Sequence, residues 1–199
     1  MSNTYRIMDA YRNFARRNPA VFITFNLIFS ILWISVIMGF SGEDADISGL
    51  RSARILVGLI NTIAPEADVT LDNYESLEAL ENSEKVIRKT AHMIEYGVLA
   101  FFVWAVLFGF ADLRRRYAYI IPVIFSAAVG ALDERHQTAV RGRYGTWIDV
   151  CVDAAGAVIA VFTAYALTKR YRDLKRMLDR DPGLRASSHI CEDSTADRR

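Results

Sequence analysis

The stretch Ala131-Leu-Asp-Glu-Arg-His-Gln-Thr-Ala-Val-Arg-Gly-Arg-Tyr-Gly-Thr-Trp-Ile-Asp149 places a dense run of charge between two apolar runs. Membrane-spanning helices rarely have such neighbours, because an ionisable group costs free energy wherever hydrocarbon surrounds it. Residues kept at that cost are candidates for a functional site. The polar side chains that make the stretch unusual are Asp133, Glu134, His136, Gln137, Arg141, Arg143 and Asp149.

Hydrophobic residues make up 52% of the 199-residue chain and the formal net charge is +1, values that would also suit a soluble domain. Their distribution indicates otherwise, since most of them lie in four runs, at about 20–40, 90–111, 117–135 and 147–168. Roughly 20 apolar residues cross a hydrocarbon core about 30 Å thick. The first, second and fourth runs are long enough, while the third must include its charged end. We therefore expect an all-α integral membrane protein whose four spans form a helix bundle.

A soluble helix bundle is the alternative interpretation of these runs. A soluble helix has a polar stripe, whereas residues 98–108 are apolar on every face of a helix. Such a helix needs lipid or a very large core around it, and this chain is too short to build that core. The runs are therefore interpreted as membrane spans.

The basic residues predict the orientation of the spans. Arginine and lysine concentrate in the N-terminal tail at 1–19, between the second and third spans at 114–116, and in the basic part of the C-terminal tail at 169–199. Cytoplasmic segments carry an excess of these residues. Both termini are therefore expected in the cytoplasm. The acidic segment 41–89 would then be extracytoplasmic.

Three smaller expectations follow from the same topology. Segment 41–89 contains an amphipathic piece that should lie along the outer surface or cap the bundle, and Ser83 is predicted to be the N-cap of the second spanning helix. The polar tail after Asp181 is expected to be disordered. No disulfide is expected, because the topology keeps Cys151 and Cys191 apart.

Helical spacing brings polar side chains of three spans to one level of the membrane. Residues three or four positions apart share a helical face, and a rise of about 1.5 Å per residue gives their depth. Polar residues placed at random along three spans would not all fall at the same depth. We therefore expect a shared polar pocket at the outer membrane face. The side chains concerned are His92, Glu95 and Tyr96 of the second span, Asp133 and Gln137 of the third, and Asp149 and Asp153 of the fourth.

Four motifs follow one another along these spans. They are Arg88-Lys-Thr-Ala-His-Met-Ile-Glu-Tyr-Gly-Val-Leu99, Leu132-Asp-Glu-Arg-His-Gln137, Arg141-Gly-Arg143 and Asp149-Val-Cys-Val-Asp-Ala-Ala-Gly156. In this order they resemble the VanZ-like membrane proteins, a family named after a product of glycopeptide-resistance clusters. The resemblance extends from about Ser41 to Ala166, and Ser41, Ser48 and Ser52 resemble the family's serine-bearing stretch.

The resemblance implies an integral membrane protein of the cell envelope, and an association with teicoplanin resistance in some members. It supplies no reaction, so the chemistry must come from the residues themselves. In the first hypothesis the protein is an enzyme that acts on a lipid-linked or cell-wall substrate. His92 would be the general acid or base and Asp133 or Glu134 its partner. The substrate-binding candidates are Lys89, Glu95, Tyr96, Gln137, Arg141, Arg143, Asp149 and Asp153.

Two alternatives need no catalysis. In the first, the same pocket binds an anionic lipid headgroup, a wall precursor or the glycopeptide itself, because arginine and lysine clusters at a membrane surface suit that role. In the second, Asp133, Arg141 and Asp149 form a buried ion-pair network that fixes the register of the helices. Membrane lipids are partners in all three hypotheses.

Other chemistries find no support in the sequence. His92 and Glu95 are spaced as two zinc ligands could be, but two ligands do not make a site, and no metal or cofactor is predicted. Phosphate-binding glycine loops and nucleophile elbows are absent. The basic residues lie beside predicted spans, which argues against nucleic acid as a partner. The sequence does not determine the oligomeric state.

Overall fold

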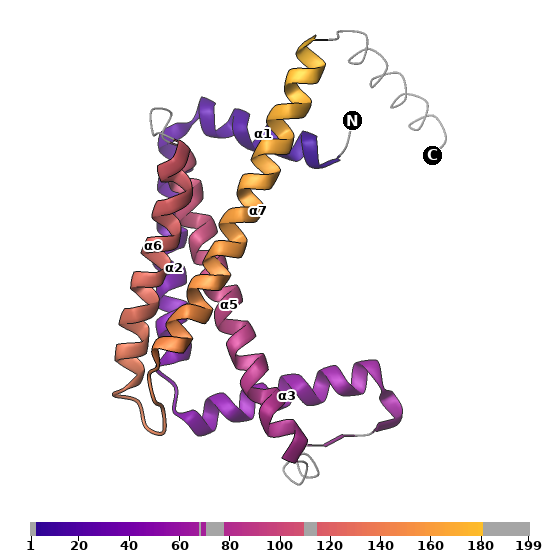
Figure 1. The fold of residues 1–199 in the computed structure, drawn as a ribbon, viewed down its shortest axis with the longest axis vertical. Coiled ribbons are helices and arrows are strands. Elements are labelled where there is room, and N and C mark those ends of the chain that lie inside the picture. The colour runs from indigo at the N-terminus through magenta and orange to yellow at the C-terminus, as the bar shows by residue number, and fades with distance from the viewer. Residues whose placement is uncertain (1–2, 68, 71–77, 110–114, 181–199) are drawn as a thin grey trace.

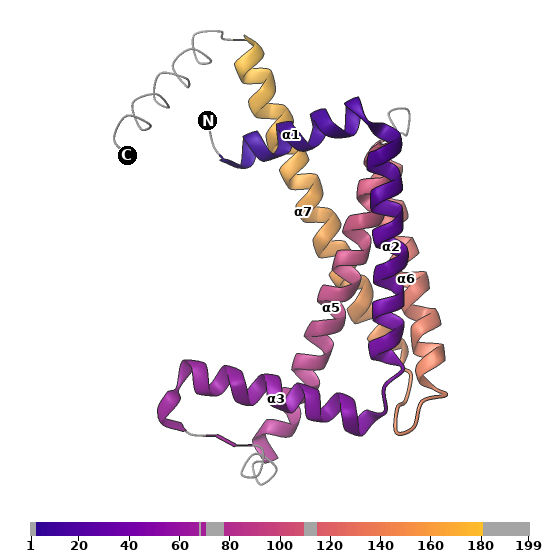
Figure 2. The same ribbon diagram turned by 180° about the vertical axis from the view of Figure 1, so that it is seen from behind.

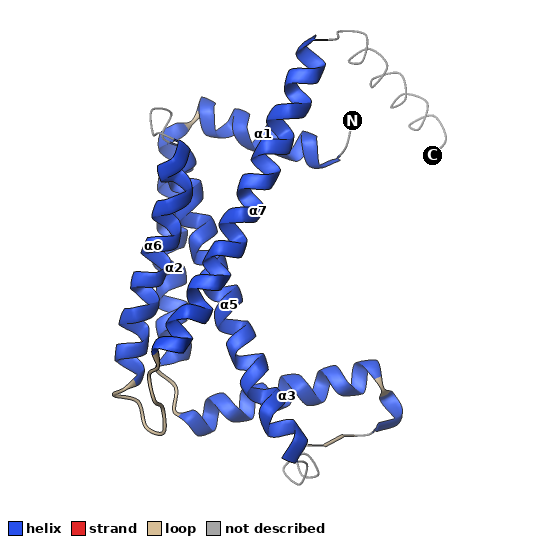
Figure 3. Ribbon diagram, in the orientation of Figure 1, coloured by secondary structure: helices blue, strands red, loops and turns tan. Residues whose placement is uncertain are grey.

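The computed structural model describes residues 3–67, 69–70, 78–109 and 115–180, and this part of the chain is built from helices and their connections, without a strand (Figure 3). This confirms the predicted all-α fold. The elements are α1 (Asn3–Arg17), α2 (Pro19–Ser41), α3 (Ala45–Ile63), the 3-10 turn η1 (Pro65–Ala67), α5 (Glu78–Gly109), α6 (Arg115–Gln137) and α7 (Trp147–Arg180).

Four of these helices are long and apolar enough to cross a membrane, and they stand side by side as a bundle (Figure 1). Their outward faces carry large apolar side chains, such as Ile124 and Phe162, which are 63% and 67% exposed. Such a large apolar surface is unfavourable in water but favourable in contact with the hydrocarbon of a bilayer. The chain is therefore an integral membrane protein. The spans are Pro19–Ser41, Lys85–Gly109, Arg116–Gln137 and Trp147–Arg180.

Helix α5 is the centre of the bundle, since it packs against α7, α2, α6 and α3. Its closest approach to α7 is at two glycines. A Cβ atom on Gly156 would collide with the backbone of Met93, and one on Gly97 would lie 3.2 Å from the carbonyl oxygen of Gly156. Small residues let spanning helices approach this closely. The contact holds Asp153, one turn before Gly156, against the interior of the bundle.

Helix α1 lies across one end of the bundle, and the chain turns into α2 at Asn18 and Pro19 (Figure 2). Proline disfavours the helical conformation at the residue before it, which explains the turn. The Tyr11 ring packs at 6.5 Å from that of Trp104 and 5.0 Å from that of Phe22, measured between centroids. Burial raises the pKa of Tyr11 above its usual range. These contacts fix α1 to the bundle.

Helix α3 lies across the opposite end, which we call the α3 end, and extends to the same side of the bundle as α1 (Figures 1 and 2). Its buried side chains Ala53 and Leu56 pack with Ile87 of α5. At its start, the Ala45 amide donates a 3.3 Å hydrogen bond to the Arg141 carbonyl in the α6–α7 loop. The amphipathic piece of the 41–89 segment thus covers one end of the bundle.

The last helix extends beyond its predicted span at about 147–168 and continues to Arg180, where Tyr171 and Leu178 pack with Tyr5 of α1. The predicted start of the second spanning helix is wrong. Helix α5 begins at Glu78, so Ser83 lies inside it and is not its N-cap. Its first turns are rich in glutamate, alanine and leucine, which favour helix. The predicted disorder after Asp181 concerns residues outside the described part of the chain.

Candidate functional site

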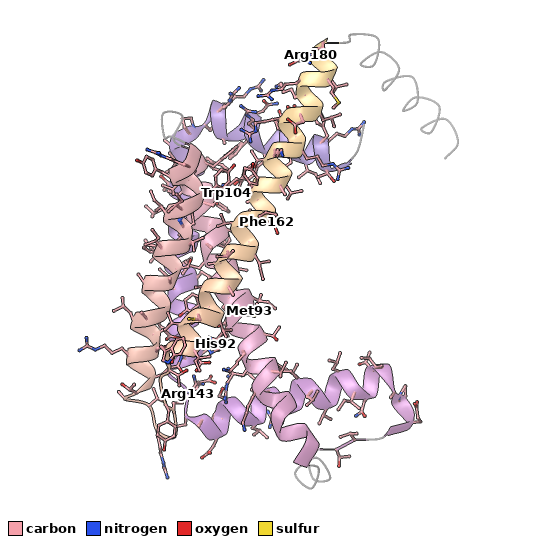
Figure 4. All side chains as sticks on the ribbon, viewed as in Figure 1. His92, Met93, Trp104, Arg143, Phe162 and Arg180 are labelled. Atoms are coloured by element: carbon pink, nitrogen blue, oxygen red, sulfur yellow. The ribbon has the colours of Figure 1, made fainter. Side chains whose placement is uncertain are left out.

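A polar cavity of about 180 Å³ lies at the α3 end, between α5, α6, α7, the start of α3 and the α6–α7 loop. Figure 4 shows His92 and Arg143 near one another at this end. The cavity therefore joins residues that are far apart in the sequence. Its lining residues are Ala45, Arg88, Lys89, His92, Glu134, Gln137, Gly142, Arg143, Tyr144, Asp149, Val152 and Asp153.

Two arginines face this cavity and have no carboxylate partner among the described residues. Neither Arg88 nor Arg143 forms an ion pair within the described part of the chain. Burial lowers the pKa of Arg143, and the positive charge of Arg88 lowers it further. A guanidinium presents planar N–H donors that match phosphate and carboxylate oxygens. The two like charges thus create a place where an anion would be stabilised.

Lys89 differs from these arginines because it already forms an ion pair with Asp149. Its Nζ lies 2.7 Å from Oδ1 of Asp149. The Asp149 amide donates to the Thr146 hydroxyl at 3.2 Å, and that hydroxyl donates to Oδ2 of Asp149 at 2.7 Å. Thr146 and Asp149 thus cap the start of α7. Asp149 therefore has both oxygens committed, one to α5 and one to the helix cap.

The loop between α6 and α7 has two glycine positions that bring Arg143 to the cavity. Gly142 has a φ of 73°, a left-handed conformation that glycine adopts without strain. A Cβ atom on Gly145 would collide with the Glu134 carbonyl oxygen. This close approach lets the Thr146 amide donate a 2.8 Å hydrogen bond to Oε2 of Glu134. Glu134 thus anchors the loop as well as lining the cavity.

Histidine His92 lines the cavity from α5. Its Nδ1 is buried, has no hydrogen-bond partner among the described residues, and lies 3.6 Å from Oε2 of Glu95. Its ring is stacked beside that of Tyr96, with centroids 6.4 Å apart. Among the described carboxylates, Glu95 lies within ion-pair distance of His92, whereas the hypothesised partners Asp133 and Glu134 do not.

The side chain of Asp133 is fully buried and does not line the cavity. The Ser41 hydroxyl and the Gln137 amide donate to its Oδ2 at 2.6 Å and 3.0 Å, so α2 is tied to α6. The predicted ion-pair network does not form: Asp149 pairs with Lys89, and Arg141 is exposed to the outside. The loop turns at Gly142, which sends the two neighbouring arginines to different sides.

The structure brings most of the predicted site residues together. Four predicted residues do not line the cavity: Glu95, Tyr96, Asp133 and the exposed Arg141. The predicted residues that line the cavity are Lys89, His92, Glu134, Gln137, Arg143, Asp149 and Asp153.

Two further polar residues line the cavity and were not among the predicted site residues. Arg88 lies one turn before His92, so its spacing already placed it on the same face. Tyr144 gave no such signal, because a loop has no periodicity from which to predict it. Among the described residues, no group of three histidine, cysteine, aspartate or glutamate side chains is placed to hold a metal ion.

Four apolar spans with a charged cavity at one end define a polytopic membrane protein with a polar site near the membrane boundary. The chain belongs to the VanZ/LLP1 family, whose family model matches residues 22–168. The resemblance drawn from the motifs is thereby confirmed. Comparisons with curated proteins and with solved structures gave no match.

Proposed function

We propose that this protein binds the phosphate of an anionic lipid headgroup, or of a lipid-linked cell-wall precursor, in the cavity at the α3 end. The observation that carries the proposal is the pair Arg88 and Arg143, which share the cavity and have no carboxylate partner among the described residues. Arginine beside a membrane surface attracts anionic headgroups. A bound phosphate would neutralise both guanidinium groups at once.

The cavity is proposed to face the outside of a bacterial plasma membrane. The helices α1 and α7 carry many basic residues at the opposite end of the bundle, including Arg16, Arg17, Lys169 and Arg170. Basic segments favour the cytoplasmic side. Both termini would then be cytoplasmic, and α3 would lie on the outer surface.

The volume of the cavity limits what it can hold. Pockets for drug-sized ligands have volumes of about 300–1,000 Å³, whereas this cavity has about 180 Å³. A phosphate or carboxylate group fits this space, but a whole glycopeptide does not. A large wall precursor would therefore enter with its charged group alone.

A second candidate function is acid–base catalysis on the bound headgroup, which the position of His92 favours. Its Nδ1 is free of hydrogen bonds within the described residues, and Oε2 of Glu95 lies 3.6 Å away. A small approach would let Glu95 orient the imidazole, leaving the other ring nitrogen to exchange a proton with a ligand. Glu134, in the same cavity, is a further proton carrier.

Binding is tested with two arginines of one loop. We expect Arg143→Gln to weaken binding of phosphatidylglycerol to the purified protein roughly tenfold or more, since a charge-assisted hydrogen bond contributes about 1.5–3 kcal/mol. Arg141→Gln is the matched control, because Arg141 is exposed outside the cavity. Native mass spectrometry gives the bound fraction of each variant. Equal binding by the two variants would remove the proposal.

Catalysis is tested on the same samples. The wild type is incubated with isotopically labelled envelope lipids, and products are sought by mass spectrometry. The second candidate requires a product that His92→Ala no longer forms while it still binds phosphatidylglycerol. Lipid returned unchanged by the wild type leaves binding as the function.

A part in teicoplanin resistance is proposed as a consequence of binding at this site. Expression of the wild type in a sensitive bacterium would then raise the inhibitory concentration of teicoplanin, and Arg143→Gln would abolish the increase. Arg141→Gln should behave as the wild type does. If the inhibitory concentration of teicoplanin still rises with Arg143→Gln, resistance does not depend on binding in the cavity.

A further inference from the structure

A second hollow lies on the membrane-facing side of the bundle, between α5 and α7. It is an apolar groove of about 450 Å³, which falls within the range of ligand pockets. Among its lining residues are Met93 and Phe101 from α5, and Ile159 and Leu167 from α7. All of these residues lie inside the spanning segments. The groove is therefore exposed to the hydrocarbon of the bilayer.

The groove begins where the polar cavity ends. On α5 the cavity wall includes Lys89 and the groove wall starts at Thr90, while on α7 the cavity ends at Asp153 and the groove starts at Gly156. The ion pair between Lys89 and Asp149 lies at this boundary. A molecule in the groove would thus have its polar end beside the cations of the cavity.

Helices α1 and α3, at the two ends of the bundle, extend to the same side of it as the groove. Figures 1 and 2 show α1 and α3 extending to one side of the bundle, and Figure 4 shows Met93 and Phe162 on the intervening part of α5 and α7. The face between them is concave, because α5 leans outward toward the α3 end and α7 leans outward toward α1.

We propose that the groove binds an acyl chain of an anionic glycerophospholipid whose phosphate lies at the cavity, so that the ligand enters sideways from the bilayer between α5 and α7. The identity of the headgroup site rests on the proposed function, whereas the chain site rests on the groove. Charge complementarity orients the lipid, because the cavity at one end of the groove is lined by Arg88, which has no carboxylate partner among the described residues.

The length of the groove matches one leaflet. It extends on α5 from Thr90 to Phe101 and on α7 from Gly156 to Leu167, which at about 1.5 Å per residue is roughly 16 Å in each case. Half of a hydrocarbon core about 30 Å thick is about 15 Å. An acyl chain from the leaflet at the α3 end fills this depth. A long polyprenyl chain would extend well beyond it.

The groove is tested by filling it from an exposed position. Thr163 lines the groove from α7 and is exposed, so Thr163→Trp should occupy it without disturbing the core. We expect phosphatidylglycerol with two long chains to bind roughly tenfold more weakly, which is the effect of losing contact with about two methylene groups. Thr90→Trp fills the other end of the groove and should act alike. Val158→Trp is the control, because Val158 is exposed on α7 outside the groove.

Each variant is purified in detergent, its thermal midpoint is compared with that of the wild type, and its bound lipid is counted by native mass spectrometry. Glycerol phosphate, which has a headgroup phosphate and no chain, is the second probe. The inference predicts that Thr163→Trp leaves glycerol phosphate binding unchanged, while Arg143→Gln weakens it.

The outcomes separate the two proposals. Wild-type binding of phosphatidylglycerol by both groove variants, with loss only in Arg143→Gln, would overturn the chain site and keep the headgroup site. Loss in both groove variants and none in Arg143→Gln, for phosphatidylglycerol and phosphatidylcholine alike, would keep the chain site and remove the proposed function. Preferential retention of polyprenyl phosphate over phosphatidylglycerol would overturn the assignment of the occupant.

Discussion

The hydroxyl of Ser41 donates a 2.6 Å hydrogen bond to Oδ2 of Asp133, although the two residues are 92 positions apart. Gln137 donates to the same oxygen at 3.0 Å. Ser41 is the last residue of α2, and Gln137 is the last of α6. A buried carboxylate therefore joins the ends of two helices that otherwise have few contacts with each other.

Replacing Ser41 by alanine should destabilise the protein. The change leaves buried Asp133 with one donor fewer, and an unsatisfied buried polar group costs about 1–3 kcal/mol. Equilibrium unfolding in mixed micelles measures the free energy. Ser35→Ala is the control, because Ser35 is exposed on the same helix and donates a hydrogen bond to the Ile31 carbonyl. Equal losses in both variants would contradict a special role for Ser41.

The ion pair between Lys89 and Asp149 should couple α5 to α7 only weakly. Its side chains are 44% and 30% exposed, and exposed pairs contribute about 0.2–1 kcal/mol. A double-mutant cycle with Lys89→Ala and Asp149→Ala measures this coupling. The pair Arg176 and Asp173, which is 3.8 Å long and 71% and 47% exposed, should show less. Coupling well above this range would mean that the bilayer screens the pair from water.

Removal of the Tyr11 ring should loosen α1 from the bundle. Tyr11→Ala loses contacts with Trp104 and Phe22, and the expected cost is about 2 kcal/mol, below that of a fully buried aromatic side chain. Proteolysis of α1 in intact micelles should become faster. Ile7→Ala, at a 68% exposed position on the same helix, should change neither quantity. Unchanged proteolysis of Tyr11→Ala would show that other contacts hold α1.

Lysine in place of Arg143 should make lipid binding sensitive to pH. Burial and Arg88 both lower the pKa of the group at this position, and a lysine starts from a reference value of only about 10.4. A basic group with a lowered pKa loses its charge as pH rises. Phosphatidylglycerol binding by Arg143→Lys should therefore fall between pH 7 and pH 10 relative to the wild type. Parallel pH profiles would show that position 143 does not meet the phosphate.

Single cysteines should test which side of the membrane each end faces. In a background of Cys151→Ser and Cys191→Ser, Arg54→Cys on α3 should react with an impermeant maleimide added outside intact cells. Arg176→Cys on α7 should react only after the cells are opened. Both positions are exposed in the structure. The reverse pattern would place the cavity on the cytoplasmic side.

Periodicity and length were sufficient to predict the spans and the faces of their polar residues. His92, Asp149 and Asp153 meet in the cavity because helical geometry is the same in every protein. Loops obey no such rule. Gly142, with its φ of 73°, separates Arg141 from Arg143, and no pattern in the sequence specifies which arginine faces inward.

The ion pairs between side chains of different helices could not be predicted from the sequence either. Asp149 could have met either Lys89 or Arg141, and the choice depends on the rotation of α5 against α7, which the contact of Gly156 with Met93 determines. The extension of α7 to Arg180 depends in the same way on a distant element, because its last turns are stabilised by α1. Such features arise from tertiary packing and not from local sequence.

Helices α1 and α3 lie across opposite ends of the bundle and so limit the length of the spanning part between them. Helix α2, which lies between them (Figure 1), has 23 residues and is about 34 Å long at 1.5 Å per residue. This exceeds a typical hydrocarbon thickness of about 30 Å by a few ångströms, which a modest tilt accommodates. In a much thinner bilayer, we expect α1 or α3 to be displaced from the boundary between water and lipid. We therefore expect the protein to fit bilayers of about this thickness best.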